Sequence, residues 1–289
     1  MKALPYLFAI SFFVALIISC GNSPKHVRVK IHDQGVNIAY TDTGKSDTTL
    51  LFVHGWCINK SYWSDQAACF SKKYRVITID LPGFGESGKN RSDWSTRAFS
   101  QDVDSVIVQL ELNNVILVGH SMAGDIVLQA AIDNPKTVIG LVGVDNFKNV
   151  GHPVSVQSKK DFEAAIEMLK HNFKAVALDY FKQDLFSKTT DTTIKKRVLN
   201  DVAHADSTIA AASMEQGNDF NAVEKLKQVK QKLYLINSDV HPTDANYMTA
   251  KKIPFQVLYI HGTGHFPMTE QPKEFNTALA KIIEDLKKP

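Results

Sequence analysis

Short apolar runs alternate with longer amphipathic segments along most of this 289-residue chain. The runs are rich in Val, Ile and Leu, which is typical of strands buried on both faces of a parallel sheet. Such strands are predicted at residues 50–53, 75–80, 115–118, 138–144, 233–236 and 255–260. Segments with helical spacing of apolar residues separate most of them. The pattern therefore predicts an α/β fold with a mostly parallel, doubly wound sheet, preceded by an antiparallel hairpin near residues 27–40.

The alternation of strands and helices is interrupted at residues 147–217. No apolar strand is predicted there, whereas 161–186 and 192–214 show helical periodicity. Ligands of open α/β sheets bind at the carboxyl ends of the strands. We therefore expect 147–217 to form a helical cap over that site, and 26–146 with 218–289 to form the core. Packing of these helices at the edge of the sheet is the alternative.

The N-terminus differs from the rest of the chain. Lys2 precedes an almost wholly apolar run, Leu4 to Ile18, which is short for a membrane-spanning helix and typical of a secretory signal. The segment 17–20 also resembles a bacterial lipobox. We expect 1–19 to be a lipoprotein signal peptide, Cys20 to carry lipid, and 20–25 to tether the enzyme to a membrane outside the cytoplasm, facing the periplasm or the cell exterior. An uncleaved anchor, or a simple signal peptide with an incidental cysteine, is the alternative.

The composition restricts the function classes. Hydrophobic residues make up 44% of the chain and charged residues 22%, as in ordinary soluble domains. The net charge is +3 and the lysines are scattered, so no nucleic-acid partner is predicted. Cys57 and Cys69 are expected to be buried and unpaired, although an oxidising compartment permits a disulfide.

A serine follows one predicted strand at a turn of small residues. The strand 115–118 leads into Gly119-His120-Ser121-Met122-Ala123-Gly124, and a helix is predicted from residue 125. This is the context of the G-x-S-x-G nucleophile elbow, where strand and helix come so close that only small residues fit. Ala123 stands where the second glycine is usual, and Gly124 follows at once. The pattern predicts Ser121 as a nucleophile.

This elbow and three further segments, in the same order, resemble the α/β-hydrolase superfamily from about residue 26 to the end. The three are an oxyanion-loop motif at His54-Gly55-Trp56, a loop after the fourth strand at residues 80–87, and a catalytic-histidine loop at 262–266. The resemblance implies the α/β-hydrolase fold and a serine hydrolase activity that uses a Ser-acid-His triad. The resemblance also implies a small-molecule, ester-like substrate and no cofactor.

A serine needs a base, and the base needs a carboxylate to orient it. His265 is predicted as the base because Gly262 and Gly264 give it a flexible loop directly after a buried strand. Asp239, at the end of the strand 233–238, is the favoured acid in the family's chain order. Asn237 replaces the usual glycine and the spacing is shortened, so Asp145 and Asp244 remain alternatives.

The other residues near these motifs have smaller expected roles. The main-chain N–H groups of Trp56 and Met122 are expected to form the oxyanion hole. His54 is expected to make structural hydrogen bonds, and the side chain of His120 to point away from that of Ser121. Phe84, Trp56, Phe173, Tyr180 and Phe181 are candidates for an apolar acyl pocket or for plain core.

The hypothesis is a serine hydrolase that cleaves a carboxylic ester of a small or medium-sized apolar acid. The same triad also serves amide, thioester or carbon–carbon bond cleavage. No spacing of metal ligands and no phosphate-binding glycine loop is present in the sequence, so no metal or cofactor is expected. A small-molecule binder or sensor that uses the same fold without catalysis is the alternative from another class.

Overall fold

The computed structural model describes residues 31–287. The predicted signal segment, Cys20 and the tether lie outside the described residues. No helix within 31–287 combines the length and the hydrophobicity that a membrane crossing needs.

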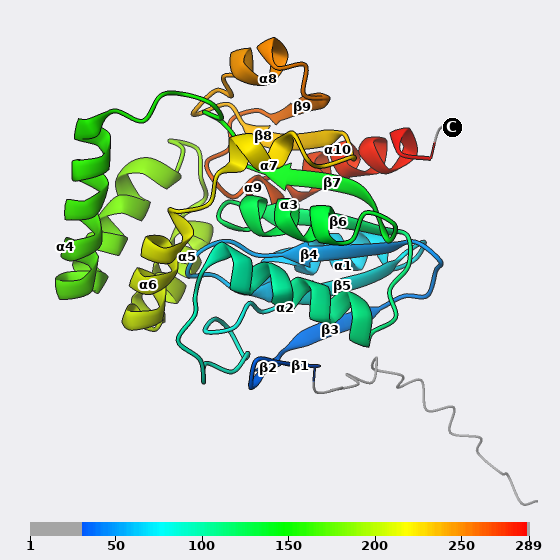
Figure 1. Ribbon diagram of the computed structural model, residues 1–289, viewed down its shortest axis with the longest axis horizontal. Helices are drawn as coiled ribbons and strands as arrows, with labels where there is room; N and C mark the ends of the chain where they lie inside the picture. Colours follow the sequence, from blue (N-terminus) through cyan, green and yellow to red (C-terminus); the bar gives the residue numbers. More distant parts are fainter. Residues whose placement is uncertain (1–30, 288–289) are drawn as a thin grey trace, which may run out of the picture.

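Seven strands form the central sheet in the order β3-β5-β4-β6-β7-β8-β9 (Figure 1). All neighbours are parallel except β3 and β5. The strands are β3 (Tyr40–Thr43), β4 (Thr49–Val53), β5 (Arg75–Ile79), β6 (Val115–His120), β7 (Val138–Val144), β8 (Leu233–Ser238) and β9 (Phe255–Ile260). The predicted parallel α/β fold is confirmed. In the hairpin at the start, β1 (Ile31–Asp33) pairs with β2 (Val36–Ile38), whereas Tyr40 already belongs to the main sheet.

Helices cover both faces of this sheet. In Figure 1, α2 (Thr96–Gln109) and α3 (Ala123–Asp133) lie in front of the sheet and pack on each other, whereas α1 (Ser64–Phe70) lies behind it. The C-terminal α10 (Pro272–Asp285) packs against α1, with apolar side chains such as Phe275 and Leu279 buried. Both faces of the central strands are therefore closed, which explains why β4 and β6 consist entirely of buried residues. The short elements are η1 (Lys60–Trp63), α7 (Ala222–Leu226), α8 (Asn246–Ala250) and α9 (Pro267–Glu270).

A group of helices separates β7 from β8. It consists of α4 (Val156–Tyr180), the π-helical turn η2 (Phe181–Leu185), α5 (Thr192–His204) and α6 (Ser207–Gly217). Ser155, Asp191 and Asp206 cap the first turns of α4, α5 and α6 with side-chain hydrogen bonds. Figure 1 shows these helices beside the end of the sheet toward which the strand arrows point. We call α4, η2, α5 and α6 the cap.

The sheet reverses its winding direction between β4 and β6. From β4 the chain moves to β5 on one side, and then returns to β6 on the other side of β4. The carboxyl ends of β4 and β6 lie next to each other at this switch point, where open α/β sheets bind ligands. The residues that follow these two strands are His54 and Ser121, so the fold brings two of the predicted motifs together.

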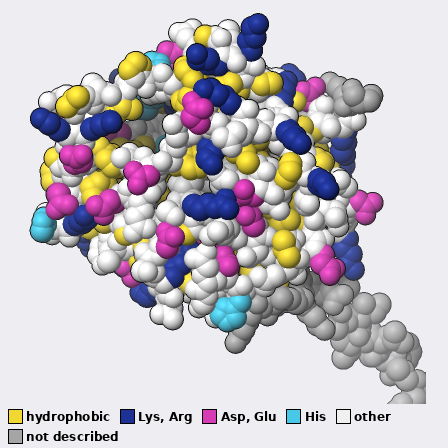
Figure 2. Space-filling view, viewed as in Figure 1, with side chains coloured by type: hydrophobic (Ala, Val, Ile, Leu, Met, Phe, Trp, Pro, Cys, Tyr) yellow, Lys and Arg dark blue, Asp and Glu magenta, His cyan; other side chains and the backbone are white. Residues whose placement is uncertain are grey.

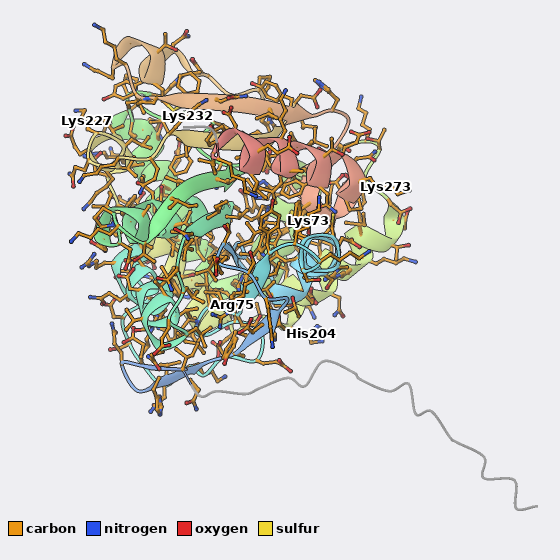
Figure 3. The ribbon with its side chains drawn as sticks, turned by 90° about the vertical axis from the view of Figure 1, so that its right-hand side faces the viewer. Lys73, Arg75, His204, Lys227, Lys232 and Lys273 are labelled. Carbon is orange, nitrogen blue, oxygen red and sulfur yellow. The ribbon has the colours of Figure 1, made fainter. Side chains whose placement is uncertain are left out.

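Charged side chains of both signs are scattered over the surface. Figure 2 shows no stripe of a single sign on the face it displays, and the basic residues labelled in Figure 3 are spread over several elements. This distribution agrees with the small net charge of +3.

Candidate active site

Ser121 occupies a sharp turn between β6 and α3. Its φ of 53° lies in the left-handed region, which a residue with a Cβ seldom adopts. Two backbone hydrogen bonds hold the turn: the Ser121 N–H donates to the Val144 carbonyl at 2.9 Å, and the Gly124 N–H donates to the Ser121 carbonyl at 2.9 Å. The predicted nucleophile elbow is thus present as strand, strained turn and helix.

The small residues of the elbow are required by close packing. A Cβ at position 119 would lie 2.5 Å from the Ala123 carbonyl oxygen. A Cβ at position 124 would collide with the side-chain amide of Asn146. Ala123 itself is fully buried and fits. Gly124 therefore meets the small-residue requirement one position later than the usual motif.

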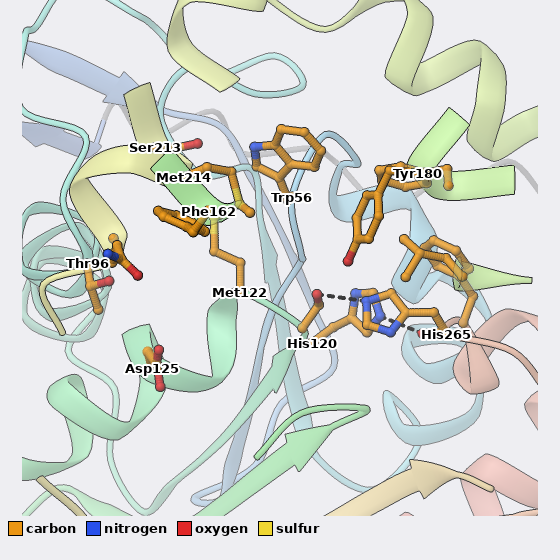
Figure 4. A pocket seen from close by; sticks show the side chains of 16 residues that line it. Trp56, Thr96, His120, Met122, Asp125, Phe162, Tyr180, Ser213, Met214 and His265 are labelled. Atoms are coloured by element: carbon orange, nitrogen blue, oxygen red, sulfur yellow. Dashed lines mark hydrogen bonds between the residues drawn. The ribbon is translucent and has the colours of Figure 1, made fainter. Parts of the chain in front are cut away.

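The imidazole of His265 joins Ser121 to a carboxylate, but the carboxylate is that of Asp145. His265 Nε2 lies 2.7 Å from Ser121 Oγ (Figure 4), and His265 Nδ1 lies 2.6 Å from Asp145 Oδ2. A carboxylate only accepts, so Nδ1–H donates to Asp145 and leaves Nε2 free to accept the serine proton. The three side chains form the hydrogen-bonded chain that serine hydrolysis needs.

The prediction that Asp239 orients His265 is wrong in this structure. Asp239 Oδ2 instead accepts from His261 Nδ1 at 2.8 Å, and its other oxygen accepts from the Gly262 N–H at 3.1 Å. The side chain of Asp239 is 39% exposed, against 3% for Asp145. Asp244, the other alternative, pairs with His152 at the surface. The physical reason is the place of each aspartate in the sheet. Asp145 directly follows β7, the neighbour of the strand β6 that precedes Ser121, whereas Asp239 follows β8, one strand further away.

Asp145 is fixed by partners on both oxygens. Its Oδ1 accepts from the Ser238 N–H at 2.8 Å and from Lys148 Nζ at 2.8 Å. Burial alone would raise the pKa of Asp145, but the hydrogen bond and charge of His265, together with Lys148, hold that pKa well below its usual range. The group is therefore a carboxylate, as an orienting acid must be.

His120 has a role that the sequence did not predict. Its Nε2–H donates to the main-chain carbonyl of His265 at 2.8 Å, and the two ring centroids are 4.8 Å apart. Burial and the neighbouring charge of His265 lower the pKa of His120 to about 3, so the ring is neutral. His120 therefore holds the loop that carries His265, and only its adjacency to Ser121 in the sequence could have indicated this.

The loop after β4 passes close to the elbow. A Cβ at position 55 would lie 3.0 Å from the Cβ of Ser121 and 2.6 Å from His120 Nδ1, so a side chain does not fit there. His54 is fully buried; its Nδ1–H donates to the Gly55 carbonyl and its Nε2 accepts from the Leu81 N–H. The prediction of structural hydrogen bonds by His54 is confirmed. Assignment of the Trp56 and Met122 N–H groups as oxyanion donors stays a prediction.

A pocket of about 260 Å³ lies between this chain of three residues and the cap. The core contributes Trp56, Thr96, His120, Ser121, Met122, Asp125, His265 and Phe266, and the cap and its end contribute Phe162, Tyr180, Phe181, Leu185, Ser213, Met214, Gly217 and Asn218. Figure 4 shows the Tyr180 hydroxyl directed toward His265. The cap therefore covers Ser121 with mostly apolar side chains.

Two of the aromatic candidates belong to the core instead. Phe173 packs against Trp56 with ring centroids 5.8 Å apart, and Phe84 packs against His54 at the same distance. Neither lines the pocket, whereas Trp56, Tyr180 and Phe181 do. The sequence pattern did not distinguish pocket positions from core positions among these residues.

The thiols and the possible metal ligands take no part in this site. Cys57 and Cys69 are both free, as predicted, but Cys69 is exposed rather than buried. Within residues 31–287 no three His, Cys, Asp or Glu side chains are grouped so that they could hold a metal ion.

Comparisons with known proteins agree with this fold. An esterase/lipase-named protein of Mycoplasma genitalium is 28% identical over 255 residues, covering 84% of this chain and 92% of that protein. The solved structure of a thermophilic esterase from Thermogutta terrifontis superposes with a TM-score of 0.77 at 21% identity, covering 88% and 95% of the two chains, and shows the same fold. By contrast, the dihydrolipoyllysine-residue acetyltransferase component of an acetoin cleaving system from Cupriavidus necator is 27% identical over 143 residues, so this chain spans only 38% of that protein.

A family model described as the alpha/beta hydrolase fold matches residues 48–272, which include Ser121, Asp145 and His265. The match covers most of the chain, from β4 to the start of α10. The chain belongs to the α/β-hydrolase family.

Proposed function

We propose that this protein is a serine hydrolase that cleaves a carboxylic ester of a small or medium-sized apolar acid through an acyl-enzyme. The observation that carries the proposal is the hydrogen-bonded chain from Ser121 Oγ through His265 to Asp145. Its supports are the nucleophile elbow, the covered apolar pocket and the esterase-named relative.

The proposed hydrolysis follows the order of steps known for such a chain of three residues. Ser121 Oγ attacks the carbonyl carbon while His265 Nε2 takes its proton, and Asp145 stabilises the imidazolium that forms. The N–H groups of Met122 and Trp56 stabilise the oxyanion. When the tetrahedral intermediate collapses, the bond to the alcohol breaks and His265 returns the proton to the leaving oxygen. Water then attacks the acyl-enzyme, His265 again acts as base, and the acid leaves while Ser121 regains its proton.

The pocket supports a substrate of modest size. A volume of about 260 Å³ suits a short or medium acyl group, and Trp56, Phe181 and Leu185 offer apolar surface to it. The same three residues could also cleave an amide, a thioester or a carbon–carbon bond, so the bond type is the finer part of this proposal. Hydrolysis rates across esters, thioesters and amides of one acid test it.

A fluorophosphonate probe separates the hydrolase from a binder that lacks catalysis. The probe phosphonylates only an activated serine, so we expect labelling of the wild type and a loss of at least 100-fold in Ser121→Ala. Ser92→Ala, at an exposed serine, is the matched control and keeps full labelling. A folded wild type that takes up no probe contradicts the proposal and favours a small-molecule binder.

We also propose, from the sequence alone, that the protein is exported and anchored by lipid on Cys20. The residues concerned lie outside the described part of the chain, so the support is the apolar run and the lipobox-like segment. Labelling with radioactive palmitate in a bacterial host tests this, because Cys20→Ser removes the acceptor sulfur. Equal incorporation in both proteins contradicts lipid on Cys20.

A further inference from the structure

One end of the pocket is polar and lies apart from the reacting groups. It is formed by Thr96, Asp125 and Asn218, which we call the polar end. In Figure 4, Met122 lies between Asp125 and Thr96 on one side and His265 on the other. The three residues come from the first turn of α2, the first turn of α3 and the residue after α6.

The carboxylate of Asp125 is the unusual group at this end. Within residues 31–287 it has no hydrogen bond and no ion pair, although it faces the pocket. Burial raises the pKa of Asp125 to about 7, and no charged neighbour offsets this effect. The side chains that line the pocket include no Lys or Arg. This carboxylate is therefore partly exposed to the pocket and is not neutralised by any side chain of residues 31–287.

Thr96 and Phe162 line the same pocket as Asp125 and shape its polar end. Thr96 is 7% exposed, and a Cβ at position 217 would lie in ordinary contact with its hydroxyl, 3.6 Å away, so the end of α6 covers it. The aromatic ring of Phe162 also lines the pocket on this side (Figure 4). An aromatic face and a carboxylate together favour a cation over a neutral group.

We propose that the polar end is a subsite for an ammonium group of the substrate, with Asp125 as its counter-ion and Phe162 beside it. The inference rests on the proposed function and narrows its substrate to esters that carry a positive charge away from the carbonyl. For an apolar acid the charge lies on the alcohol side, as in an ester of an amino alcohol.

Two pairs of substrates test the subsite, each a cation and its neutral isostere. The alcohol-side pair is butyrylcholine and 3,3-dimethylbutyl butyrate. The acid-side pair is the p-nitrophenyl ester of 4-(trimethylammonio)butyric acid and that of 5,5-dimethylhexanoic acid. At pH 8 we expect kcat/KM for the cation to exceed that for its isostere at least 10-fold in one pair. A preference in the alcohol-side pair supports the inference as stated, whereas a preference in the acid-side pair alone keeps the subsite but contradicts the apolar acid of the proposed function.

Substitution of the carboxylate by an amide is the decisive variant. Asp125→Asn keeps the shape and is expected to lower the ratio of cation to isostere at least 10-fold. Asp65→Asn makes the same change of net charge at an exposed site on α1 and should leave the ratio within 2-fold of wild type. A wild-type ratio of one or less in both pairs, or a ratio that Asp125→Asn leaves unchanged, overturns the subsite.

Two further measurements keep the test independent of folding and of the proposed function. In the wild type, choline should slow fluorophosphonate labelling of Ser121 at concentrations where 3,3-dimethylbutanol does not; equal effects of the two alcohols count against the subsite. Labelled protein without a preference for cations overturns this inference alone. Folded protein without labelling overturns the hydrolase proposal itself.

Discussion

The ends of β7 and β8 carry one aspartate each, and the two aspartates have opposite surroundings. Asp145, after β7, is almost fully buried and shares its oxygens among His265, Lys148 and the Ser238 N–H. Asp239, after β8, pairs with His261 in a solvent-exposed contact. Both residues satisfy the rule that a carboxylate follows a strand and faces a histidine. Only one of them faces the histidine that reaches Ser121.

The difference follows from the distance of each strand end to the nucleophile. His120 and Val144 are register partners at the ends of β6 and β7. Asp145 and Ser121, the next residues of the two strands, therefore lie at the same level of the sheet. β8 lies beyond β7, and neighbouring strands are about 4.8 Å apart. An acid after β8 has to reach back across this gap, and the segment that follows β8 here instead leads Asp239 toward the loop that contains His261. Strand order and register, rather than position in a sequence motif, therefore decide which aspartate contacts His265.

The largest expected effect is on catalysis by Asp145→Asn. The amide cannot hold His265 in the tautomer that accepts the serine proton, so we expect kcat/KM on a simple ester to fall about 10³- to 10⁴-fold. Asp239→Asn is the matched control and should stay within about 3-fold of wild type, since its partner is His261. The assignment fails if the loss is found in Asp239→Asn rather than in Asp145→Asn.

A smaller effect is expected at Lys148. Its ammonium group holds Asp145 Oδ1 at 2.8 Å and also donates to Ser238 Oγ at 3.1 Å. Without it, Asp145 keeps the His265 contact but loses one of its anchors, so Lys148→Met should lower kcat/KM about 10-fold. Lys148→Arg keeps the positive charge beside Asp145 and should therefore lower kcat/KM less than Lys148→Met does. Wild-type rates for Lys148→Met would show that the Ser238 N–H suffices to fix the carboxylate.

The two aspartates should also differ in their effects on stability. The pKa of folded Asp145 lies below the unfolded value of about 3.9, so its ionised form stabilises the protein above that pH. This contribution is lost as the pH falls through the lower, folded pKa. We therefore expect Asp145→Asn to reduce the free energy of unfolding by about 2 kcal/mol at pH 7, and by less near pH 3.

Urea unfolding of both variants at the two pH values measures this difference. Asp239→Asn alters an exposed pair and should change the free energy of unfolding by less than about 0.5 kcal/mol at pH 7. Equal losses in both variants would mean that burial of Asp145 brings no extra stabilisation.

Local patterns predicted much of this site, whereas long-range pairing did not follow from them. Strand, turn and helix around Ser121 are contiguous in sequence, and the elbow was predicted with its small residues in place. His265 was identified from a loop with two glycines, and the structure puts it within hydrogen-bond distance of Ser121. The acid depends on which strand lies beside β6, and neither apolar runs nor motif spacing reveal strand order. The hydrogen bond from His120 to the His265 carbonyl likewise joins residues 145 positions apart.

Two hydrogen bonds join the cap to the loops that surround the pocket. The His265 N–H donates to the Leu185 carbonyl at 2.8 Å, and the indole of Trp56 donates to the Ala210 carbonyl at 2.9 Å. If the cap moved away as one rigid body, both hydrogen bonds would break and the loop that carries His265 would lose one of its contacts. We therefore expect any opening of the cap to disturb the position of His265, and slow hydrogen exchange at the His265 amide would show that the contact with Leu185 persists.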